Sequence, residues 1–323
     1  MQAAIFPTLG GPEVIRLATI PEPTVGPNDV LVQVLAVAVN HVDTFVRSGG
    51  FKTALADPHV VGRDMVGTVL QCGSAVTQFT VGQQVWTNSM GYDGRPGVTS
   101  DQVAVPVERL YPVPAGVDPI QLVAAVHSAA TASIVLNAEM HARTGETLLV
   151  EGAAGHVGRK FVALGKVMGL HVITTSAPRD FAQLRQLGSD QCLDYHADLA
   201  DGVAELVDHV VDTSGQVALQ DNLALLAEAG DVTLITAPAD NQFQFAVRQF
   251  YTSRQRLNGF VISHATQEEL ATAAAQLNTC FAEGKLLEDT VLLKSFVDAA
   301  WAHQALADGT VHRQKIVLTP TQK

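Results

Sequence analysis

The sequence predicts an α/β protein with two domains, and three features support this prediction. A chain of 323 residues is longer than one hydrophobic core usually covers. Before about residue 120, short β-rich runs alternate with Gly/Pro turns, which is typical of a barrel-like β domain. After this point strands alternate with helices, and continuous apolar strands indicate a parallel sheet covered on both faces. The second region is therefore predicted to be a doubly wound α/β domain.

The expected elements of the first region are short strands. They are Met1–Phe6, Val14–Ile20, Val30–Val39, Met65–Cys72 and Gln102–Pro106. Loops are predicted at Pro21–Asp29 and Val113–Pro119, because turn-forming Pro, Gly, Asn and Asp gather there.

The second region is predicted to alternate strands with helices. Its strands are Thr147–Glu151, His171–Ser176, Gln191–Tyr195, His209–Thr213, Asp231–Thr236 and Leu257–Ser263. The helices expected between them include Val157–Met168, Arg179–Leu187 and Val217–Ala229. The last segment is predicted to hold helices near Gln267–Glu283 and Val297–Ala307 and a final strand, Lys315–Leu318.

The charge and cysteine content exclude several classes of protein. The chain has 20 Lys+Arg and 32 Asp+Glu, and the resulting net charge of −12 argues against a nucleic-acid partner. We find no apolar run of about 18 residues and no signal-peptide pattern, so we expect no membrane span. The 3 cysteines lack a C-x-x-C spacing, which excludes a disulfide scaffold and a Cys-rich zinc site. The sequence thus predicts a soluble, cytoplasmic protein.

The strongest local signal is the glycine-rich segment Thr147–Gly158, in which a predicted strand runs through a turn into a predicted helix. Gly155 and Gly158 occupy the second and third glycine positions of the dinucleotide-binding fingerprint, and Ala153 stands at the first. The candidate cofactor contacts of this turn are Gly152, Ala153, Gly155, His156, Val157 and Gly158. The alternative is a tight turn without a ligand. The imidazole of His156 could donate to a phosphate oxygen or point into solvent, and we slightly favour solvent.

The residues after the second strand of this region favour NADPH over NADH. A protein that binds NAD usually places Asp or Glu about 20 residues beyond the fingerprint, where it binds the ribose 2′-hydroxyl. Here no carboxylate precedes Asp180, whereas Ser176 and Arg179 offer a hydroxyl and a guanidinium to a 2′-phosphate. The alternative is that Arg179 is an ordinary residue in the first turn of a helix.

Several segments, taken together, resemble a known family. Val39–Gly49 is similar to the pattern N-x-x-D-x-x-x-R-x-G, and Val61–Val69 is similar to G-x-D-x-x-G-x-V. Four others resemble G-D-x-V, G-A-A-G-G-V-G, A-x-x-A-H and G-K-I-V-L, namely Val81–Val85, Glu151–Gly158, Ala299–His303 and Lys315–Leu318. The Asp of G-D-x-V is missing, and His156 and Gln314 replace glycines. In this order the segments resemble the zinc-independent quinone oxidoreductase branch of the medium-chain dehydrogenase/reductase superfamily, over essentially the whole chain.

The resemblance implies the domain organisation and the cofactor. It implies a GroES-like catalytic domain, residues 1–122 completed by residues 264–323, and a Rossmann NADPH-binding domain, residues 123–263. Nicotinamide and a small-molecule substrate would share a cleft. Members of this family are commonly homodimers or homotetramers joined through their cofactor domains, and we expect a homodimer.

The resemblance also bears on metal binding. The resemblance implies that the zinc-ligand positions of the zinc-dependent relatives correspond here to Asn40, Arg63 and His127. Only His127 could bind zinc, and the charge of Arg63 would repel a dication, so we predict no metal. Without a Lewis acid, hydride transfer to a quinone or an activated C=C bond is easier to support than alcohol oxidation.

The family's catalytic positions correspond to Asn40 and Thr131. Asn40 would approach the nicotinamide and donate to an oxyanion, although it could equally cap a loop. Thr131 would lie near the nicotinamide. We expect Asp43 to hold its own loop, and His127 to be a satisfied core histidine rather than an acid.

The family's tyrosines are replaced here by Phe45 and Phe51, which puts proton donation by tyrosine in doubt. Tyr92 and Tyr251 are possible substitutes, and protonation by water is the default expectation. The remaining cofactor contacts that the resemblance implies are Tyr195, Ser214, Ala237, Phe260, Val261, Ile262 and either Arg313 or Lys315.

Three functions remain open. The first is an NADPH-dependent reductase of quinones, enones or enals. The second is an enoyl-thioester reductase of the same fold, against which the acidic charge speaks mildly. The third is a non-catalytic NADPH-binding protein with a regulatory or structural role, because a fold does not fix a function.

Overall fold

The computed structural model describes residues 1–311 and 313–321 and divides into two compact units. The first unit combines Met1–His127 with Leu270–Lys323, and the second is Ser128–Glu269. The predicted boundaries at 122/123 and 263/264 stay predictions, and the two units meet inside continuous helices. These helices are α2, Pro119–Ile134, and α8, Gln267–Ala282.

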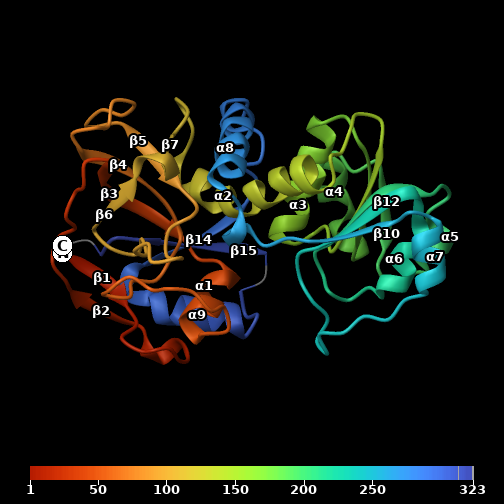
Figure 1. Ribbon diagram of the computed structural model, residues 1–323, viewed down its shortest axis with the longest axis horizontal. Helices are drawn as coiled ribbons and strands as arrows, with labels where there is room; N and C mark the ends of the chain where they lie inside the picture. Colours follow the sequence, from red (N-terminus) through yellow and green to blue (C-terminus); the bar gives the residue numbers. More distant parts are fainter. Residues whose placement is uncertain (312, 322–323) are drawn as a thin grey trace. The chain divides into compact units, whose positions relative to one another are not determined.

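The first unit is built on a seven-stranded sheet with the order β14-β15-β3-β4-β5-β7, in which β6 also pairs with β3. Its strands are β3 Asp29–Ala38, β4 Asp64–Cys72, β5 Gln84–Thr87, β6 Gln102–Pro106, β7 Tyr111–Pro112, β14 Thr290–Ser295 and β15 Gln314–Thr319. A separate hairpin joins β1, Gln2–Ile5, to β2, Arg16–Thr19. Because β15 pairs with β3, the C-terminal segment completes the N-terminal domain, which confirms the prediction (Figure 1).

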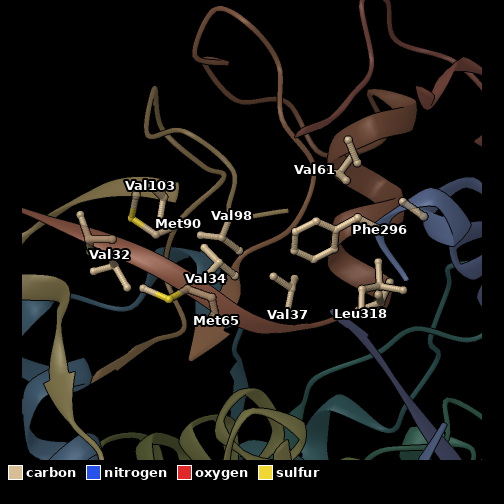
Figure 2. Close-up of a cluster of buried hydrophobic side chains, with 14 of the residues drawn as sticks. Val32, Val34, Val37, Val61, Met65, Met90, Val98, Val103, Phe296 and Leu318 are labelled. Carbon is tan, nitrogen blue, oxygen red and sulfur yellow. The ribbon is translucent and has the colours of Figure 1, made fainter. Parts of the chain in front are cut away.

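The core of the first unit lies against the buried face of this sheet. Val32 and Val34 alternate with exposed or half-buried residues along β3, as expected for a strand with one solvated face. Figure 2 shows these valines packed with Met65 of β4 and Leu318 of β15. Phe296, 1% exposed, enters the same cluster from the segment before α9. Burial of each such side chain contributes about 1.5–3 kcal/mol.

The second unit contains a six-stranded parallel sheet with the order β10-β9-β8-β11-β12-β13. The strands are β8 Thr147–Glu151, β9 His171–Ser176, β10 Gln191–Asp194, β11 Val207–Asp212, β12 Leu226–Leu234 and β13 Arg256–Gly259. The chain proceeds from β8 outward through β9 to β10 and then returns to the other side of β8 at β11. This reversal is the topological switch point of a doubly wound sheet, where such proteins bind ligands. The predicted fold class is confirmed.

The helices connect these strands and cover the sheets. Besides α2 and α8 they are α1 His41–Ser48, α3 His156–Val167, α4 Phe181–Leu187, α5 Leu199–Gly202, α6 Leu219–Leu225, α7 Val247–Thr252 and α9 Ala299–Ala307. A π-helical turn, Val135–Glu139, extends α2. Short 3-10 turns lie at Pro12–Val14, Val107–Arg109, Pro178–Asp180, Ile262–His264 and Phe296–Asp298.

Two predicted elements of the second unit differ from the structure. The expected helix Val217–Ala229 ends at Leu225, because Leu226 already pairs with Val207 and begins β12. The expected strand Leu257–Ser263 ends at Gly259, the last residue that pairs with β12. Phe260 still donates its N–H to Leu234 O at 3.0 Å, and the chain then turns into a 3-10 segment.

Among the described residues, one helical stretch is long and apolar enough to cross a membrane. It is Pro119–Glu139, which comprises α2 and its π-helical extension. Of its most apolar window, 78% is buried inside the protein, as in a core helix of a soluble protein.

Candidate functional site

Asn40 lies where the chain leaves β3 and enters α1. Its backbone N–H donates to Asp43 Oδ2 at 2.8 Å. A carboxylate at this position satisfies a donor that the helix itself leaves without an acceptor, which stabilises the helix start. Asp43 therefore holds its own loop, as the sequence predicts.

The side chain of Asn40 belongs to a buried polar cluster, which we define as Asn40, Asp43, Arg63, Asp64, His127 and Lys315. Lys315 Nζ donates to Asn40 Oδ1. Asn40 Nδ2 donates to Asp64 Oδ2 at 2.7 Å and, at 3.4 Å, to Ala38 O. The two ends of the amide are thus held by an ammonium and a carboxylate, which fixes its orientation. Both hydrogens of Nδ2 are already donated to protein oxygens. The expected donation of this amide to a substrate oxyanion stays a prediction.

His127 joins the polar cluster through Asp64. Its Nδ1 lies 3.2 Å from Asp64 Oδ2, and the side chains are 12% and 0% exposed. Burial lowers the pKa of His127 below its ordinary value; the charges of Lys315 and Arg63 lower it further, while Asp64 opposes this. A carboxylate only accepts hydrogen bonds, so the neutral imidazole carries its proton on Nδ1. The contact with Asp64 is consistent with the expected core histidine, and that role stays a prediction.

Burial also changes the ionisation of two other members of the polar cluster. The pKa of Asp43 is raised to about 7, by burial first and by the neighbouring charge of Asp64 second. Burial lowers the pKa of Arg63, which Asp64 and Asp43 partly offset. The guanidinium of Arg63 lies 5.5 Å from the ring centroid of Tyr92, and that ring packs on Phe51 at 5.4 Å. Tyr92, a candidate proton donor, is therefore engaged by a cation and an aromatic ring.

The donor chemistry at the positions expected for zinc does not fit a zinc site. Asn40, Arg63 and His127 offer an amide, a guanidinium and one imidazole, whereas zinc is usually bound by several thiolates, imidazoles or carboxylates. Within residues 1–311 and 313–321, no group of three or more His, Cys, Asp or Glu side chains is placed to hold a metal. That the protein uses no metal stays a prediction.

The glycine turn between β8 and α3 is shaped by close approaches. A Cβ on Gly158 would lie 2.7 Å from Ala153 Cα, so only glycine lets α3 pack this close to the turn. Gly152 has φ of 67°, and a Cβ there would lie 2.8 Å from Thr213 Oγ1. Ala153 is fully buried and donates its N–H to Thr175 O at 3.1 Å.

The amino end of α3 follows the glycine turn directly, as the fingerprint predicts. Gly155 is its N-cap and supplies no side-chain cap to the first turn. A Cβ on Gly155 would meet only Gly152 O, at 3.3 Å, and Gly155 is exposed, so this side of the turn is open. His156 and Val157 open the helix, and His156 Nδ1 lies 3.1 Å from Arg159 Nη2. These residues fit a dinucleotide pyrophosphate.

Ser176 and Arg179 follow the carboxyl end of β9, next to the switch point. Ser176 is 4% exposed and donates its hydroxyl to Ala177 O at 3.2 Å. The side chain of Arg179 is 74% exposed, and its Nε lies 3.9 Å from Asp180 Oδ2. Their contact with a 2′-phosphate stays a prediction.

The other predicted cofactor residues of the second unit also follow carboxyl ends of strands. Tyr195 follows β10, is 54% exposed, and packs on His196 with a centroid distance of 4.1 Å. Ser214 follows β11 in a turn built on Asp212 Oδ1, which accepts from Ser214 N and Oγ at 2.8 Å. The residues after β12 and β13 are Ala237, Phe260, Val261 and Ile262. Ligands bind along this edge in doubly wound sheets.

Thr131 and Lys315 lie elsewhere in the chain. Thr131 is 7% exposed and lies on α2, one helical turn after His127. Lys315, expected at the cofactor phosphates, lies in β15 and donates to Asn40. Its alternative, Arg313, is exposed and has φ of 61°.

Two features of the site were not predicted from the sequence. Asp64 is part of a family motif, but its partners lie far away in sequence. Glu151 and Asp212 end neighbouring strands at the glycine turn, and both are fully buried. Burial, followed by the charge of Asp212, raises the pKa of Glu151 to about 8, and Asn222 Nδ2 donates to its Oε2 at 2.9 Å. In the sequence, Glu151 is a charged residue at the end of the otherwise apolar strand Thr147–Glu151, and this signal could have predicted a buried carboxylate there.

The fold and the glycine turn define the class of a two-domain dinucleotide-dependent dehydrogenase or reductase. Comparison with family models agrees: the alcohol dehydrogenase GroES-like domain matches residues 26–115, and the zinc-binding dehydrogenase family matches residues 157–279. The chain belongs to the medium-chain dehydrogenase/reductase superfamily and is a quinone oxidoreductase-like member of it. The resemblance inferred from the sequence motifs is confirmed.

Individual relatives cover most of the chain. A trans-enoyl reductase from Aspergillus terreus is 32% identical over 222 residues, which is 64% of this chain and 72% of that protein. A quinone oxidoreductase from Pseudomonas aeruginosa is 29% identical over 316 residues, 94% of each protein. A mycobacterial protein solved in complex with NADPH superposes with a TM-score of 0.82 at 27% identity, covering 99% of this chain and 100% of that one.

Proposed function

We propose that this protein is an NADPH-dependent oxidoreductase that transfers a hydride to a quinone or to an activated C=C bond, as in an enone or enal, without a metal. The observation that carries the proposal is the glycine turn at the switch point, which leads into the amino end of α3 without a side-chain cap. The NADPH-bound mycobacterial relative and the quinone oxidoreductase relative support the choice of cofactor and acceptor.

The protein's own residues would bind and orient the two reactants. NADPH, when bound, supplies the hydride. The turn Gly152–Gly158 and the amino end of α3 would bind its pyrophosphate, and Ser176 with Arg179 would select its 2′-phosphate. In the first unit, Lys315 and Asp64 hold Asn40 in one orientation, so that this side chain needs no reorganisation during the reaction.

The polar cluster also favours an electron-poor acceptor. An unactivated alcohol or ketone needs strong polarisation of its oxygen, which a bound metal dication can provide. The side chains of Asn40, Arg63 and His127 are not a donor set that would hold such an ion. A quinone or enone accepts a hydride more readily, so orientation and moderate electrostatic stabilisation of the product oxyanion suffice.

An NADPH-oxidation assay with a quinone, an enone, an aldehyde and an enoyl-CoA tests the proposal. We expect turnover with the quinone or the enone, and a lower KM for NADPH than for NADH. Preferred oxidation of NADH would reject the role of Ser176 and Arg179. Turnover with the aldehyde alone would reject the acceptor class.

A second candidate is an enoyl-thioester reductase, which the similarity to the trans-enoyl reductase favours. Preferential turnover of the enoyl-CoA would support it. The candidate from another class is a non-catalytic NADPH-binding protein, suggested by Phe45 and Phe51 at the family's tyrosine positions. NADPH binding without turnover of any acceptor would favour that candidate.

We further propose that the protein is a cytoplasmic homodimer that acts on a small molecule. Sedimentation of the purified chain at several concentrations tests the oligomeric state. A monomer at micromolar concentration would reject the homodimer.

A further inference from the structure

Two buried acidic side chains end the two strands that meet at the switch point of the second unit. Glu151 is the last residue of β8 and Asp212 is the last residue of β11, and the two are paired in register in these parallel strands. Paired residues of adjacent strands direct their side chains to the same face of a sheet. Both residues are at most 1% exposed. The two carboxyl groups therefore lie on one buried face, directly before two turns that carry predicted cofactor contacts.

Each of these carboxyl groups has one oxygen that accepts hydrogen bonds and one that accepts none. Glu151 Oε2 accepts from Asn222 Nδ2 of α6 at 2.9 Å. Asp212 Oδ1 accepts from Ser214 N, Ser214 Oγ and Gly215 N at 2.8, 2.8 and 3.0 Å. Within the described part of the chain, Glu151 Oε1 and Asp212 Oδ2 have no hydrogen-bond partner. A buried polar atom without a partner is destabilising, and one proton between these two oxygens would satisfy both.

The surroundings favour Glu151 as the residue that carries this proton. Three donors to Asp212 favour the ionised form of a carboxylate, whereas the side chain of Glu151 accepts from one donor. Burial raises the pKa of Glu151 to about 8, with the charge of Asp212 as a second cause and that of Asp221 on α6 as a smaller one. The other elements next to β8 present Thr174 and Thr175 from β9 and His156, Arg159 and Lys160 from the first turns of α3.

Hydrogen bonds connect the acid pair to both turns. Thr213, which follows Asp212, donates its Oγ1 to Glu151 O at 2.6 Å and to Gly152 O at 3.2 Å. Its N–H donates to Glu151 O at 3.2 Å. Gly152 opens the glycine turn, and Asp212 Oδ1 holds the turn that contains Ser214. A second negative charge in the pair would therefore arise at the start of both turns, where an anionic cofactor is expected to bind.

We propose that Glu151 and Asp212 are positioning residues of the cofactor site that share one proton, and that NADPH binds preferentially to the protonated pair. This proposal rests on the proposed function, because it requires the pyrophosphate at the glycine turn. In the protonated pair, the O–H of Glu151 donates to Asp212 Oδ2 and joins the ends of β8 and β11. Release of this proton to solvent leaves two like charges together and adds a negative charge near the pyrophosphate. NADPH and this proton therefore increase each other's affinity for the protein.

The pH dependence of the Kd for NADPH, measured by the fluorescence of the bound cofactor, tests the proposal. Between pH 7 and pH 9 the charge of NADPH is constant, because the second pKa of a phosphate monoester is about 6. We expect the Kd to rise about fivefold over this range, which corresponds to a Glu151 pKa that binding raises by about one unit. Glu151→Gln has no proton to lose and keeps a donor for Asp212. Its Kd should match the wild-type value at pH 7 and stay constant up to pH 9.

Asp221→Asn is the matched control, because it makes the same change in net charge next to the pair. Asp221 is exposed on α6 and raises the pKa of Glu151 from outside the pair. We expect the rise in Kd to persist in this variant, with its midpoint at a slightly lower pH. An equal loss of the pH dependence in both variants would overturn the role of the buried pair, as would a pH dependence that Glu151→Gln retains.

Calorimetry on the wild-type protein covers the case in which Glu151→Gln does not fold. Titration with NADPH at pH 8.5, in two buffers of different ionisation enthalpy, should show uptake of about half a proton for each NADPH bound. Binding without proton uptake would overturn this proposal alone. If NADPH did not bind at any pH, the proposed function would fail and this proposal with it. Proton-linked binding without turnover of any acceptor would support this proposal and reject the reductase activity.

Discussion

Each unit of this protein buries a histidine against carboxylates, and the two histidines titrate in opposite directions. His127 in the first unit faces one carboxylate, Asp64, with Lys315 and Arg63 nearby, and its pKa lies below the ordinary value because burial dominates. His209 in the second unit lies between Asp231, 3.1 Å from Nδ1, and Glu146, 3.0 Å from Nε2. Burial lowers the pKa of His209, but its hydrogen bonds and attraction to the two carboxylates raise it above the ordinary value.

The comparison shows that the balance of neighbouring charges, rather than burial alone, decides the ionisation of a buried group. At His209 both ring nitrogens donate to carboxylates, which favours the charged ring and a structural role. At His127 burial and the nearby cations Lys315 and Arg63 outweigh Asp64, which favours a neutral ring. The acid pair of Glu151 and Asp212 is a third case, in which burial and the charge of Asp212 raise the pKa of Glu151.

The largest expected effect follows from removal of a charge in the His209 cluster. Asp231 is fully buried and also accepts from Arg256 Nη2 at 2.8 Å. Asp231→Asn leaves the ring without one of its two carboxylates, so we expect a stability loss of about 3 kcal/mol. Urea unfolding measures it. Glu205→Gln, at an exposed carboxylate, is the control, and similar midpoints for the two variants would contradict the importance of this cluster.

The acid pair gives the next largest effect, and its sign depends on pH. The pKa of Glu151 is about 8 in the folded protein, above its ordinary value of 4.5. The folded state therefore binds this proton more tightly, and the resulting stability is full below pH 4.5 and lost as the pH rises through about 8. Glu151→Gln should be more stable than the wild type at pH 9 by at least about 1.4 kcal/mol, the equivalent of one pKa unit.

Thermal unfolding at pH 6 and pH 9 checks this prediction. The gain should be much smaller at pH 6, because Glu151 is then protonated in the folded protein. Asp221→Asn lies nearby and provides a control for the change in net charge. An equal gain from both variants at pH 9 would show that overall charge, rather than the buried pair, is responsible.

A smaller effect is expected from the pH dependence of His209. Its raised pKa means that the ion pairs contribute stability fully below the unfolded value of about 6.5, and that this contribution is lost as the pH rises through the folded value. His209→Gln should remove this slope. A series of urea midpoints between pH 6 and pH 9 measures it, and an unchanged slope in the variant would reject the assignment.

The comparison also explains how much could be predicted from the sequence. The bounds of β8 and β9 were evident because continuous apolar runs end at clear turn signals. The glycine turn was equally evident, because the chemistry of its glycines is local. The partners of Asp64 could not be found in this way: Asn40 is 24 residues away, and Lys315 is 275 residues from Asn40. Only the return of β15 to β3 brings these charges together.

The smallest expected effect tests the cations around His127. The positive charge of Lys315 opposes protonation of the ring, so Lys315→Met should raise the pKa of His127 toward its ordinary value. NMR titration of the imidazole signals measures the shift, with His127→Asn used to assign the resonance. His209 should titrate unchanged in the same spectra, because Lys315 is absent from the groups that act on it. A His127 pKa that stays constant would mean that burial alone holds the ring neutral, and the two histidines would then differ only in the number of carboxylates they face.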